Sequence, residues 1–351
     1  MSIHHRSESP DALSRVRGVL RRFTTPLLPD DYTMLLNPLW SRRELRGQIE
    51  SVQRHPDDTV HLVIRPGWGV PVEFHAGQYI GVGVQIDGRY TWRSYSLTNT
   101  PDTRDGLFSI TIRAVEKGKL SNHLIGTAEP GMTVRLAAPA GDFHLTDPLP
   151  EKLLFLTAGS GITPVVSMLR ALTDLRDTTD IRVVHSVRHP EDLIFGEVLE
   201  DFDATIQVTS EDGRVTPKIL EELVPDVSER VIYACGPATM LDQFESWAGE
   251  RELEIRTERF TLERASDAKG GTITFGTRGS TAADGATTIL EAGESIGIQM
   301  PFGCRMGICQ TCVRQLTDGH VHDLRSGDTH PPGTRIRTCV CVASGDISID
   351  V

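Results

Sequence analysis

The six cysteines of this 351-residue chain are unevenly distributed, and this distribution constrains the fold more than any other feature. Five of them lie between Cys304 and Cys341, whereas Cys235 stands alone. Disulfide-stabilised secreted domains spread their cysteines through a small fold, and a late cluster in a long chain is more typical of metal ligation or redox chemistry. The C-terminal part is therefore expected to fold around a metal or redox centre, and disulfides are the weaker interpretation.

The spacing within the cluster indicates which centre this is. A C-x4-C-x2-C run followed by a distant fourth cysteine is the arrangement that holds a plant-type [2Fe–2S] cluster. Gly303 and Gly307 suit a loop whose amides turn inward to hydrogen-bond sulfur. The four predicted ligands are Cys304, Cys309, Cys312 and Cys339.

Two other centres fit these cysteines less well. Zinc normally takes two short Cys or His pairs, and pairing Cys309–Cys312 with Cys339–Cys341 leaves no place for Cys304. A thioredoxin-type couple has no third cysteine five residues upstream. Cys341 is interpreted as a small core residue, since a free apolar cysteine usually is one.

The formal charge of −12 argues against a nucleic-acid partner, because an acidic surface repels a phosphate backbone. The charge is not uniform, since residues 1–47 contain eight Arg and five acidic residues. No apolar run approaches the roughly 18 to 20 residues needed to cross a bilayer, and residues 1–10 lack the apolar core of a signal peptide. The sequence therefore predicts a cytoplasmic protein with a basic N-terminal extension.

The residue pattern changes along the chain and predicts a multidomain protein. Residues 1–45 form an extension with an amphipathic helix at 11–23. Residues 46–148 contain short alternating runs divided by turns, as in an antiparallel β-barrel. In residues 149–266 apolar strands alternate with helical stretches, which predicts an α/β domain with a parallel sheet. Residues 267–351 form a small α+β unit that contains the cysteine cluster.

Three segments of the predicted barrel resemble the ferredoxin–NADP reductase family. TWRSYSLTN contains its R-x-Y-S motif, FHAGQYIGV (74–82) resembles the preceding strand, and KGKLSNHL (117–124) resembles the loop that binds the flavin pyrophosphate. The resemblance implies that Arg93 holds a flavin phosphate, Tyr95 lies against the ribityl chain and ring, and Ser96 faces the flavin N5. A pyrophosphate loop implies FAD rather than FMN, with predicted contacts from Gly118, Leu120, Ser121 and Asn122.

A Gly-rich turn, GSGITP, stands between a predicted strand and a predicted helix. Its glycines permit close approach of a pyrophosphate to the helix N-terminus, and its proline suits the first helical turn. In the reductase family a C-G-P turn, here beginning at Cys235, places the cysteine near the nicotinamide C4. The equal alternative is that Cys235 is a buried strand-end thiol that takes no part in the reaction. The predicted nucleotide contacts are Gly159, Gly161, Thr163, Pro164, Gly236 and Pro237.

Two arginines follow the strands at which the adenosine ribose is expected. Arg188 and Arg214 are candidates to bind a 2′-phosphate, and an arginine at this place favours NADPH over NADH. Because surface arginines are common, NADH remains the alternative donor.

Together these resemblances cover nearly the whole chain. They imply a three-domain oxidoreductase with an FAD-binding barrel, a Rossmann-like NAD(P)-binding domain and a plant-type ferredoxin domain with a β-grasp fold. The implied reaction passes a hydride from NADPH or NADH to the flavin and single electrons through the [2Fe–2S] cluster to a partner protein. Ser96, Tyr95 and Cys235 are the residues expected at the hydride-transfer site.

Residues 26–49 resemble the N-terminal extension of actinobacterial reductases that serve membrane diiron enzymes, such as acyl-CoA desaturases and alkane hydroxylases. This implies a terminal desaturase or monooxygenase as partner. The helix at 11–23 is then expected to contact anionic lipid at the inner membrane face or an acidic partner, or to pack on the acidic body of the reductase itself. Two other functions stay open: the reductase of a Rieske oxygenase, such as a steroid or aromatic-ring hydroxylase, and a ferredoxin-like carrier with an inactive reductase half.

Overall fold

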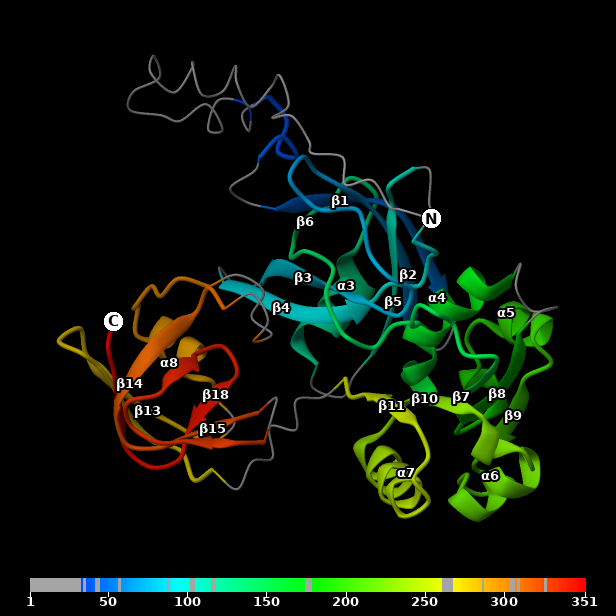
Figure 1. The fold of residues 1–351 in the computed structure, drawn as a ribbon. Coiled ribbons are helices and arrows are strands. Elements are labelled where there is room, and N and C mark those ends of the chain that lie inside the picture. Colours follow the sequence, from blue (N-terminus) through cyan, green and yellow to red (C-terminus); the bar gives the residue numbers. More distant parts are fainter. Residues whose placement is uncertain are drawn as a thin grey trace, which may run out of the picture.

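The fold is described from a computed structural model of the chain. The described residues are 33, 36–41, 45–55, 58–86, 89–101, 105–114, 118–173, 179–260, 268–285, 287–302, 307, 310–324 and 327–351. The predicted helix at 11–23 and the predicted ligands Cys304 and Cys309 lie outside them. Three units follow one another along the described chain, as Figure 1 shows.

The first unit is the predicted antiparallel barrel. Within the described residues its sheet has the strand order β4-β3-β6-β1-β2-β5. An antiparallel bridge between Leu97 and Ile110 links the two edge strands and closes the sheet on itself. Helix α3 (Lys119–Thr127) packs against four of these strands. The strands are β1 (Arg46–His55), β2 (Thr59–Pro66), β3 (Tyr79–Ile86), β4 (Arg89–Ser96), β5 (Phe108–Arg113) and β6 (Thr133–Leu136).

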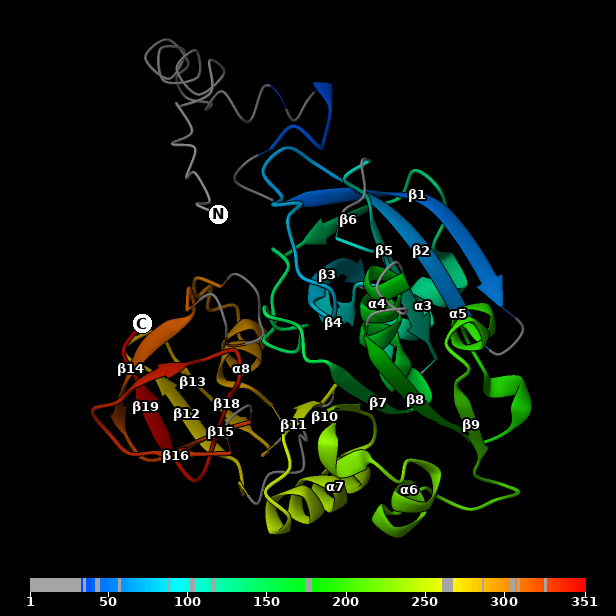
Figure 2. The same cartoon turned by 45° about the vertical axis from the view of Figure 1, so that its right-hand side comes forward.

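The second unit is a parallel sheet with the order β11-β10-β7-β8-β9 in the described chain. Alternate residues of β7 enter the two cores on either side: Leu153 packs with helices α4 and α5, and Leu154 packs with α6 and α7. This two-sided burial explains the continuous apolar runs in the sequence (Figure 2). The elements are β7 (Lys152–Ala158), α4 (Ile162–Leu172), β8 (Asp180–Val187), α5 (Gly196–Asp201), β9 (Thr205–Val208), α6 (Pro217–Leu223), β10 (Val231–Cys235), α7 (Ala238–Glu250) and β11 (Ile255–Glu258).

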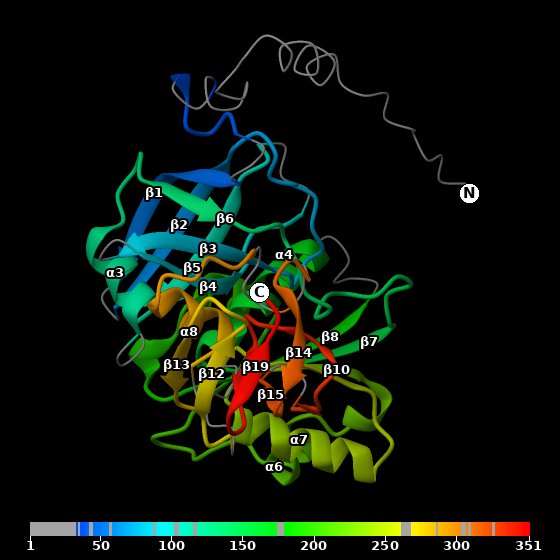
Figure 3. The ribbon, with the colours of Figure 1, turned by 90° about the vertical axis from the view of Figure 1, so that its left-hand side faces the viewer.

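The third unit contains two small sheets, with orders β13-β12-β19-β14-β17 and β16-β15-β18 among the described residues. Its helix α8 (Ile289–Ser295) begins at a capping box in which Thr288 and Glu291 bond reciprocally. Figure 3 shows α8 beside the strands of the larger sheet. The strands are β12 (Gly271–Phe275), β13 (Ser280–Ala283), β14 (Val313–Asp318), β15 (Val321–Asp323), β16 (Thr329–His330), β17 (Arg335–Arg337), β18 (Cys341–Ala343) and β19 (Ile347–Ile349).

These three units confirm the predicted fold class, namely an antiparallel barrel, an α/β domain and an α+β domain in this order. The predicted residue boundaries between them stay predictions. No helix in the described part of the chain is long and apolar enough to span a membrane.

The end of the N-terminal extension is attached to the barrel. Trp40 stacks on Trp68, with ring centroids 4.9 Å apart, and the Trp68 amide donates to the Leu39 carbonyl at 2.8 Å. A Cβ atom at Gly67 would lie 2.5 Å from the same carbonyl, so glycine is needed for this approach. Leu39 and Trp40 are therefore part of the barrel surface.

Candidate functional site

The predicted flavin motif lies at the end of the edge strand β4. Arg93 and Tyr95 are two residues apart and therefore share a face of the strand. The Arg93 side chain is exposed, and its Nη1 donates to the Trp92 carbonyl at 2.7 Å, whereas the Tyr95 hydroxyl and Ser96 Oγ are buried without a hydrogen-bond partner among the described residues. Burial also raises the pKa of the Tyr95 phenol. Unpartnered hydroxyls near an exposed arginine fit a flavin, which offers polar edges and a phosphate.

The predicted pyrophosphate segment differs from the expectation. The sequence predicted a loop over 117–124, but α3 begins directly after Gly118. The Leu120 side chain packs into the barrel core, and the Asn122 amide donates to the Gly118 carbonyl at 3.2 Å. Asn122 is thus inside the helix, and the amides before it form the helix N-terminus, where an anion is favoured.

The predicted Gly-rich turn joins β7 to α4, as expected. Gly159 has φ +56°, a left-handed conformation that favours glycine, and a Cβ atom there would meet open space. A Cβ atom at Gly161 would lie 2.1 Å from the Cys235 carbonyl oxygen. The structure therefore brings the Gly-rich turn and the Cys235-Gly236-Pro237 turn into direct backbone contact. Thr163 and Pro164 lie buried in the first turn of α4.

Helix α4 connects this turn to the segment that follows β4. Ser167 Oγ donates to the Asn99 carbonyl at 2.7 Å, and the Arg170 guanidinium donates to the Thr98 carbonyl. An ion pair between Arg113 and Asp192 adds a second link between the barrel and the nucleotide domain. The helix that begins at the Gly-rich turn thus contacts the segment directly after the predicted flavin motif.

The Cys235 thiol is completely buried in the core beneath α4. Burial raises its pKa well above the ordinary value, and the neighbouring Glu258 raises it further. In the sheet register Cys235 pairs with Glu258 on β11 and with Thr157 on β7, so the three side chains share one face. The thiol is therefore held in its protonated form, and its predicted place in hydride transfer stays a prediction.

Glu258 was missed by the sequence reasoning. Its Oε2 atom is buried with no hydrogen-bond partner in the described chain, and burial raises the pKa of the carboxyl to about 8. A single glutamate at the end of a short strand has no distinguishing sequence signal. Only the pairing of β10 with β11 places it beside Cys235.

The raised pKa of Glu258 predicts a pH-dependent stability. Between pH 4.5 and 8 the folded protein keeps a proton that the unfolded chain loses, so the free energy of unfolding falls as pH rises. From pH 6 to pH 9 the wild type should lose roughly 3 kcal/mol more than Glu258→Gln, at about 1.4 kcal/mol per pKa unit. Thermal unfolding at both pH values tests this. Glu250→Gln, on the exposed end of α7, is the control, and equal losses in all three proteins would contradict the prediction.

Arg188 and Arg214 lie on neighbouring loops after β8 and β9. The Thr209 amide donates to the Val187 carbonyl at 2.8 Å, and the Ser210 amide donates to the Arg188 carbonyl at 3.1 Å, which holds the first loop beside the second. Both arginine side chains are exposed. They lie beyond the carboxyl ends of parallel strands, the edge at which such sheets bind nucleotides.

Two of the four predicted cluster ligands are described. The buried Cys312 Sγ lies 3.2 Å from Cys339 Sγ, and the Gly307 amide donates to Cys339 Sγ at 3.2 Å. The hydrogen bond with Cys339 lowers the pKa of the Cys312 thiol. Cys312, which ionises more easily than an ordinary thiol, and Cys339, which accepts a loop amide, have the properties expected of iron–sulfur ligands.

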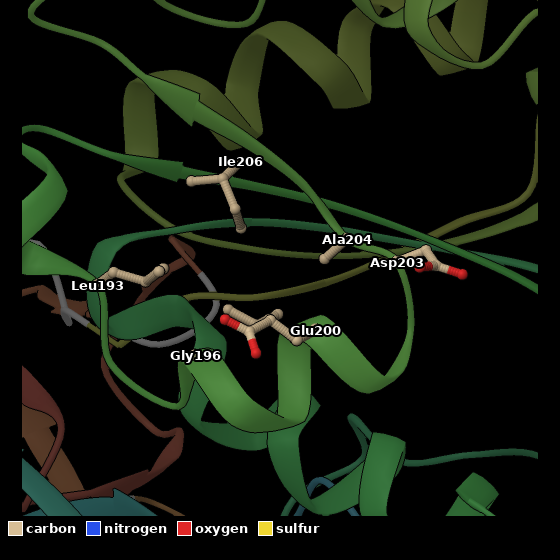
Figure 4. A pocket seen from close by; sticks show the side chains of 7 residues that line it. Leu193, Gly196, Glu200, Asp203, Ala204 and Ile206 are labelled. Carbon is tan, nitrogen blue, oxygen red and sulfur yellow. The ribbon is translucent and has the colours of Figure 1, made fainter.

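Two hollows in the described structure lie away from these motifs. One, of about 390 Å³, is bordered by Glu200 and Asp203 near α5, whose carboxylates would repel a phosphate (Figure 4). The other, of about 670 Å³, lies between the barrel wall and residues 193–198 and includes His61 and Arg170. None of the predicted cofactor contacts lines either one.

Family models match all three units in the predicted order. An oxidoreductase FAD-binding domain matches residues 67–145, an oxidoreductase NAD-binding domain matches residues 155–246, and a 2Fe-2S iron-sulfur cluster binding domain matches residues 273–344. The cofactors of the chain are therefore FAD, NAD(P)H and a [2Fe–2S] cluster.

The chain is also similar to named reductases. It is 48% identical over 349 residues to an NADPH oxidoreductase of Mycobacterium tuberculosis, covering 96% of this chain and 92% of that protein. It is 30% identical to the glycine betaine monooxygenase reductase subunit of Pseudomonas aeruginosa, covering 79% and 87%. The solved structure of phthalate dioxygenase reductase shares its fold, with a TM-score of 0.65 at 22% identity, covering 88% and 98%.

The unpartnered hydroxyls of Tyr95 and Ser96, the glycine turn against Cys235 and the adjacent thiols of Cys312 and Cys339 thus occur in units that each match a family model. The chain belongs to the ferredoxin–NADP reductase superfamily, as a three-domain NAD(P)H-dependent oxidoreductase with FAD and a [2Fe–2S] cluster.

Proposed function

We propose that this reductase takes electrons from NADPH and delivers them to a separate terminal enzyme. The observation that carries the proposal is the contact of α4 with Asn99, because it joins the helix after the predicted nucleotide turn to the segment after the predicted flavin motif. When bound, FAD accepts a hydride and releases its electrons singly, and the cluster passes them on. The protein needs no acid–base pair for this reaction, only binding and orientation.

Each motif has a distinct part in the proposal. Arg93 binds a flavin phosphate, while Tyr95 and Ser96 orient the ring from the end of β4. The turn at Gly159–Gly161 binds the nucleotide pyrophosphate at the start of α4. The four predicted cysteines hold the cluster, with Cys312 and Cys339 from the described part of the chain.

NADPH is the proposed donor because Arg188 and Arg214 are exposed on adjoining loops. The 48% identical relative is likewise named an NADPH oxidoreductase. In Arg188→Ala/Arg214→Ala, kcat/KM for flavin reduction by NADPH should fall about ten- to hundredfold, since a charged hydrogen bond contributes roughly 1.5–3 kcal/mol. The value for NADH should change little.

Stopped-flow reduction with both nucleotides measures this selection. Arg182→Ala is a matched control, because Arg182 is an exposed arginine nearer the start of β8. An equal loss of kcat/KM with NADPH and with NADH would show that the two arginines do not bind the 2′-phosphate.

The proposed acceptor is a membrane diiron desaturase or hydroxylase. Its support is the resemblance of residues 26–49 to the extension of reductases that serve such enzymes. The alignment with the Mycobacterium tuberculosis relative covers 96% of the chain, so it leaves out about 14 of the 351 residues. Most of the extension at 1–45 is therefore aligned with that relative. The basic segment at 11–23 would contact anionic lipid or the acceptor.

A Rieske oxygenase is the second candidate acceptor. Its support is that the glycine betaine relative is named a monooxygenase reductase subunit and that the fold matches phthalate dioxygenase reductase. The third alternative, a carrier with an inactive reductase half, loses support because both the FAD-binding and NAD-binding models match.

An acceptor assay distinguishes the two candidates. NADPH-driven turnover is measured with a purified diiron desaturase in anionic nanodiscs and with a purified Rieske oxygenase, using the intact chain and a variant that lacks residues 1–32. This deletion keeps the Trp40–Trp68 stack. Turnover by the desaturase alone, reduced by the deletion, supports the proposal; turnover by the Rieske enzyme alone supports the alternative. Liposome flotation unchanged by the deletion would exclude the lipid contact.

A further inference from the structure

One arginine of the ferredoxin domain connects a buried carboxylate to the cluster-binding loop. Arg337 Nη2 donates to Asp323 Oδ2 at 2.6 Å, and its Nη1 donates to the Gly307 carbonyl at 2.8 Å. The Asp323 side chain is only 1% exposed. A buried ionised carboxylate is tolerated only when a cation pairs with it, so this pair is held together strongly.

The loop residue that Arg337 contacts is bonded to a predicted cluster ligand. The Gly307 amide donates to Cys339 Sγ, while its carbonyl accepts from Arg337. Gly307 has φ +74°, and a Cβ atom there would lie 2.9 Å from Val340 Cγ2. The Arg337 guanidinium, anchored by Asp323, therefore holds Gly307, whose amide donates to Cys339 Sγ.

Arg337 is also a cation close to the predicted ligands, because it lies two residues before Cys339 and bonds the residue whose amide donates to Cys339 Sγ. Reduction adds one electron to a cluster that its thiolates already make anionic. A nearby cation and an N–H···S bond both favour the reduced form, and they act in the same direction.

We infer that Arg337, anchored by Asp323, is a positioning residue that holds the Gly307 amide on Cys339 and raises the reduction potential of the cluster. The inference depends on Cys339 being a ligand, and the Cys312→Ser variant discussed below tests the ligand set separately. No motif pointed to this pair, because Asp323 and Arg337 meet only when β15 and β17 are folded.

The test is an EPR-monitored redox titration of the intact holoprotein. Arg337→Gln should lower the equilibrium constant for cluster reduction about tenfold, a shift of about 59 mV for one electron, to more negative potential. Arg337→Lys keeps the charge and should recover most of this shift. Arg335→Gln makes the same charge change at an exposed position of the same strand and should leave the potential unchanged.

Asp323→Asn tests the anchor. It removes the ion pair that holds the guanidinium, and it also removes a negative charge, so its own potential combines two opposite effects and the test is the coupling between the two residues. Arg337→Gln should shift the potential less in the Asp323→Asn background than in the wild type.

Iron and acid-labile sulfide content are measured in every variant. If Arg337→Gln does not retain its iron, the same comparison is made with Arg337→Lys, which lacks the planar fork that reaches both Asp323 and Gly307. A shift in Arg337→Gln no larger than in Arg335→Gln, or equal shifts in both backgrounds, overturns the inference.

Discussion

Replacing Cys312 by serine should abolish NADPH-dependent reduction of cytochrome c and leave reduction of ferricyanide nearly unchanged. Cys312 Sγ lies 3.2 Å from Cys339 Sγ, and its lowered pKa makes the thiolate available as a ligand. A serine hydroxyl lacks the soft sulfur that iron–sulfur clusters require. Ferricyanide takes electrons from the flavin directly, so the barrel and nucleotide domain should continue to work.

The control for this variant is Cys341→Ala. Cys341 is also completely buried in the ferredoxin core, but burial raises its pKa to about 12, which does not favour a thiolate ligand. This variant should keep its iron, its EPR signal and its cytochrome c activity. Unchanged iron and sulfide content in Cys312→Ser would show that the assignment of the ligands is wrong.

The second large effect is expected at Gly161. In Gly161→Ala the new methyl group would lie 2.1 Å from the Cys235 carbonyl oxygen and 2.5 Å from its carbon, so the two turns must move apart. Overpacking of this kind costs roughly 1–3 kcal/mol of folding free energy. Because the displaced turns misplace the nucleotide, kcat/KM for flavin reduction by NADPH should also fall, by about ten- to hundredfold. FAD content and reduction by dithionite should not change, because the barrel is unaffected.

Gly249→Ala is the matched control in the same domain. Gly249 lies within α7, and a Cβ atom there would meet nothing within 4 Å. An alanine in a helix is favoured over glycine, so this variant should be at least as stable as the wild type and equally active. Equal NADPH activity in both variants would mean that contact between the two turns is unnecessary for nucleotide binding.

The sequence predicted the elements well wherever burial follows a regular period. In the predicted α/β domain the apolar run KLLFLT (152–157) forms β7, with both of its faces covered. In the predicted α+β unit TTILEAGES (287–295) contains α8, which begins at the capping box of Thr288 and Glu291. The segment after Gly118 was predicted as a loop but forms α3. Leu120 and Leu124 are four residues apart and both buried, which is the spacing typical of a helix. The prediction followed the motif resemblance instead of this spacing.

The candidate site was predicted only in part. Arg93, Gly161 and Cys312 could be predicted because each belongs to a short motif, and the residues of such a motif are neighbours in the sequence. Glu258 and Arg337 did not follow, because their surroundings come from strands that pair only in the folded chain.

The sequence alone determined the order of three domains, which follows from local periodicity, and the cysteine spacing of the cluster loop, while the flavin and nucleotide cofactors followed from short motifs that resemble a known family. The tertiary structure alone decided that Gly161 touches Cys235, that α4 reaches Asn99 and that Arg337 connects Asp323 to Gly307. These contacts join segments that are distant in the sequence, so they exist only in the folded chain. Burial in that fold raises the pKa of Glu258, and strand packing places Arg337 on the loop residue that bonds Cys339.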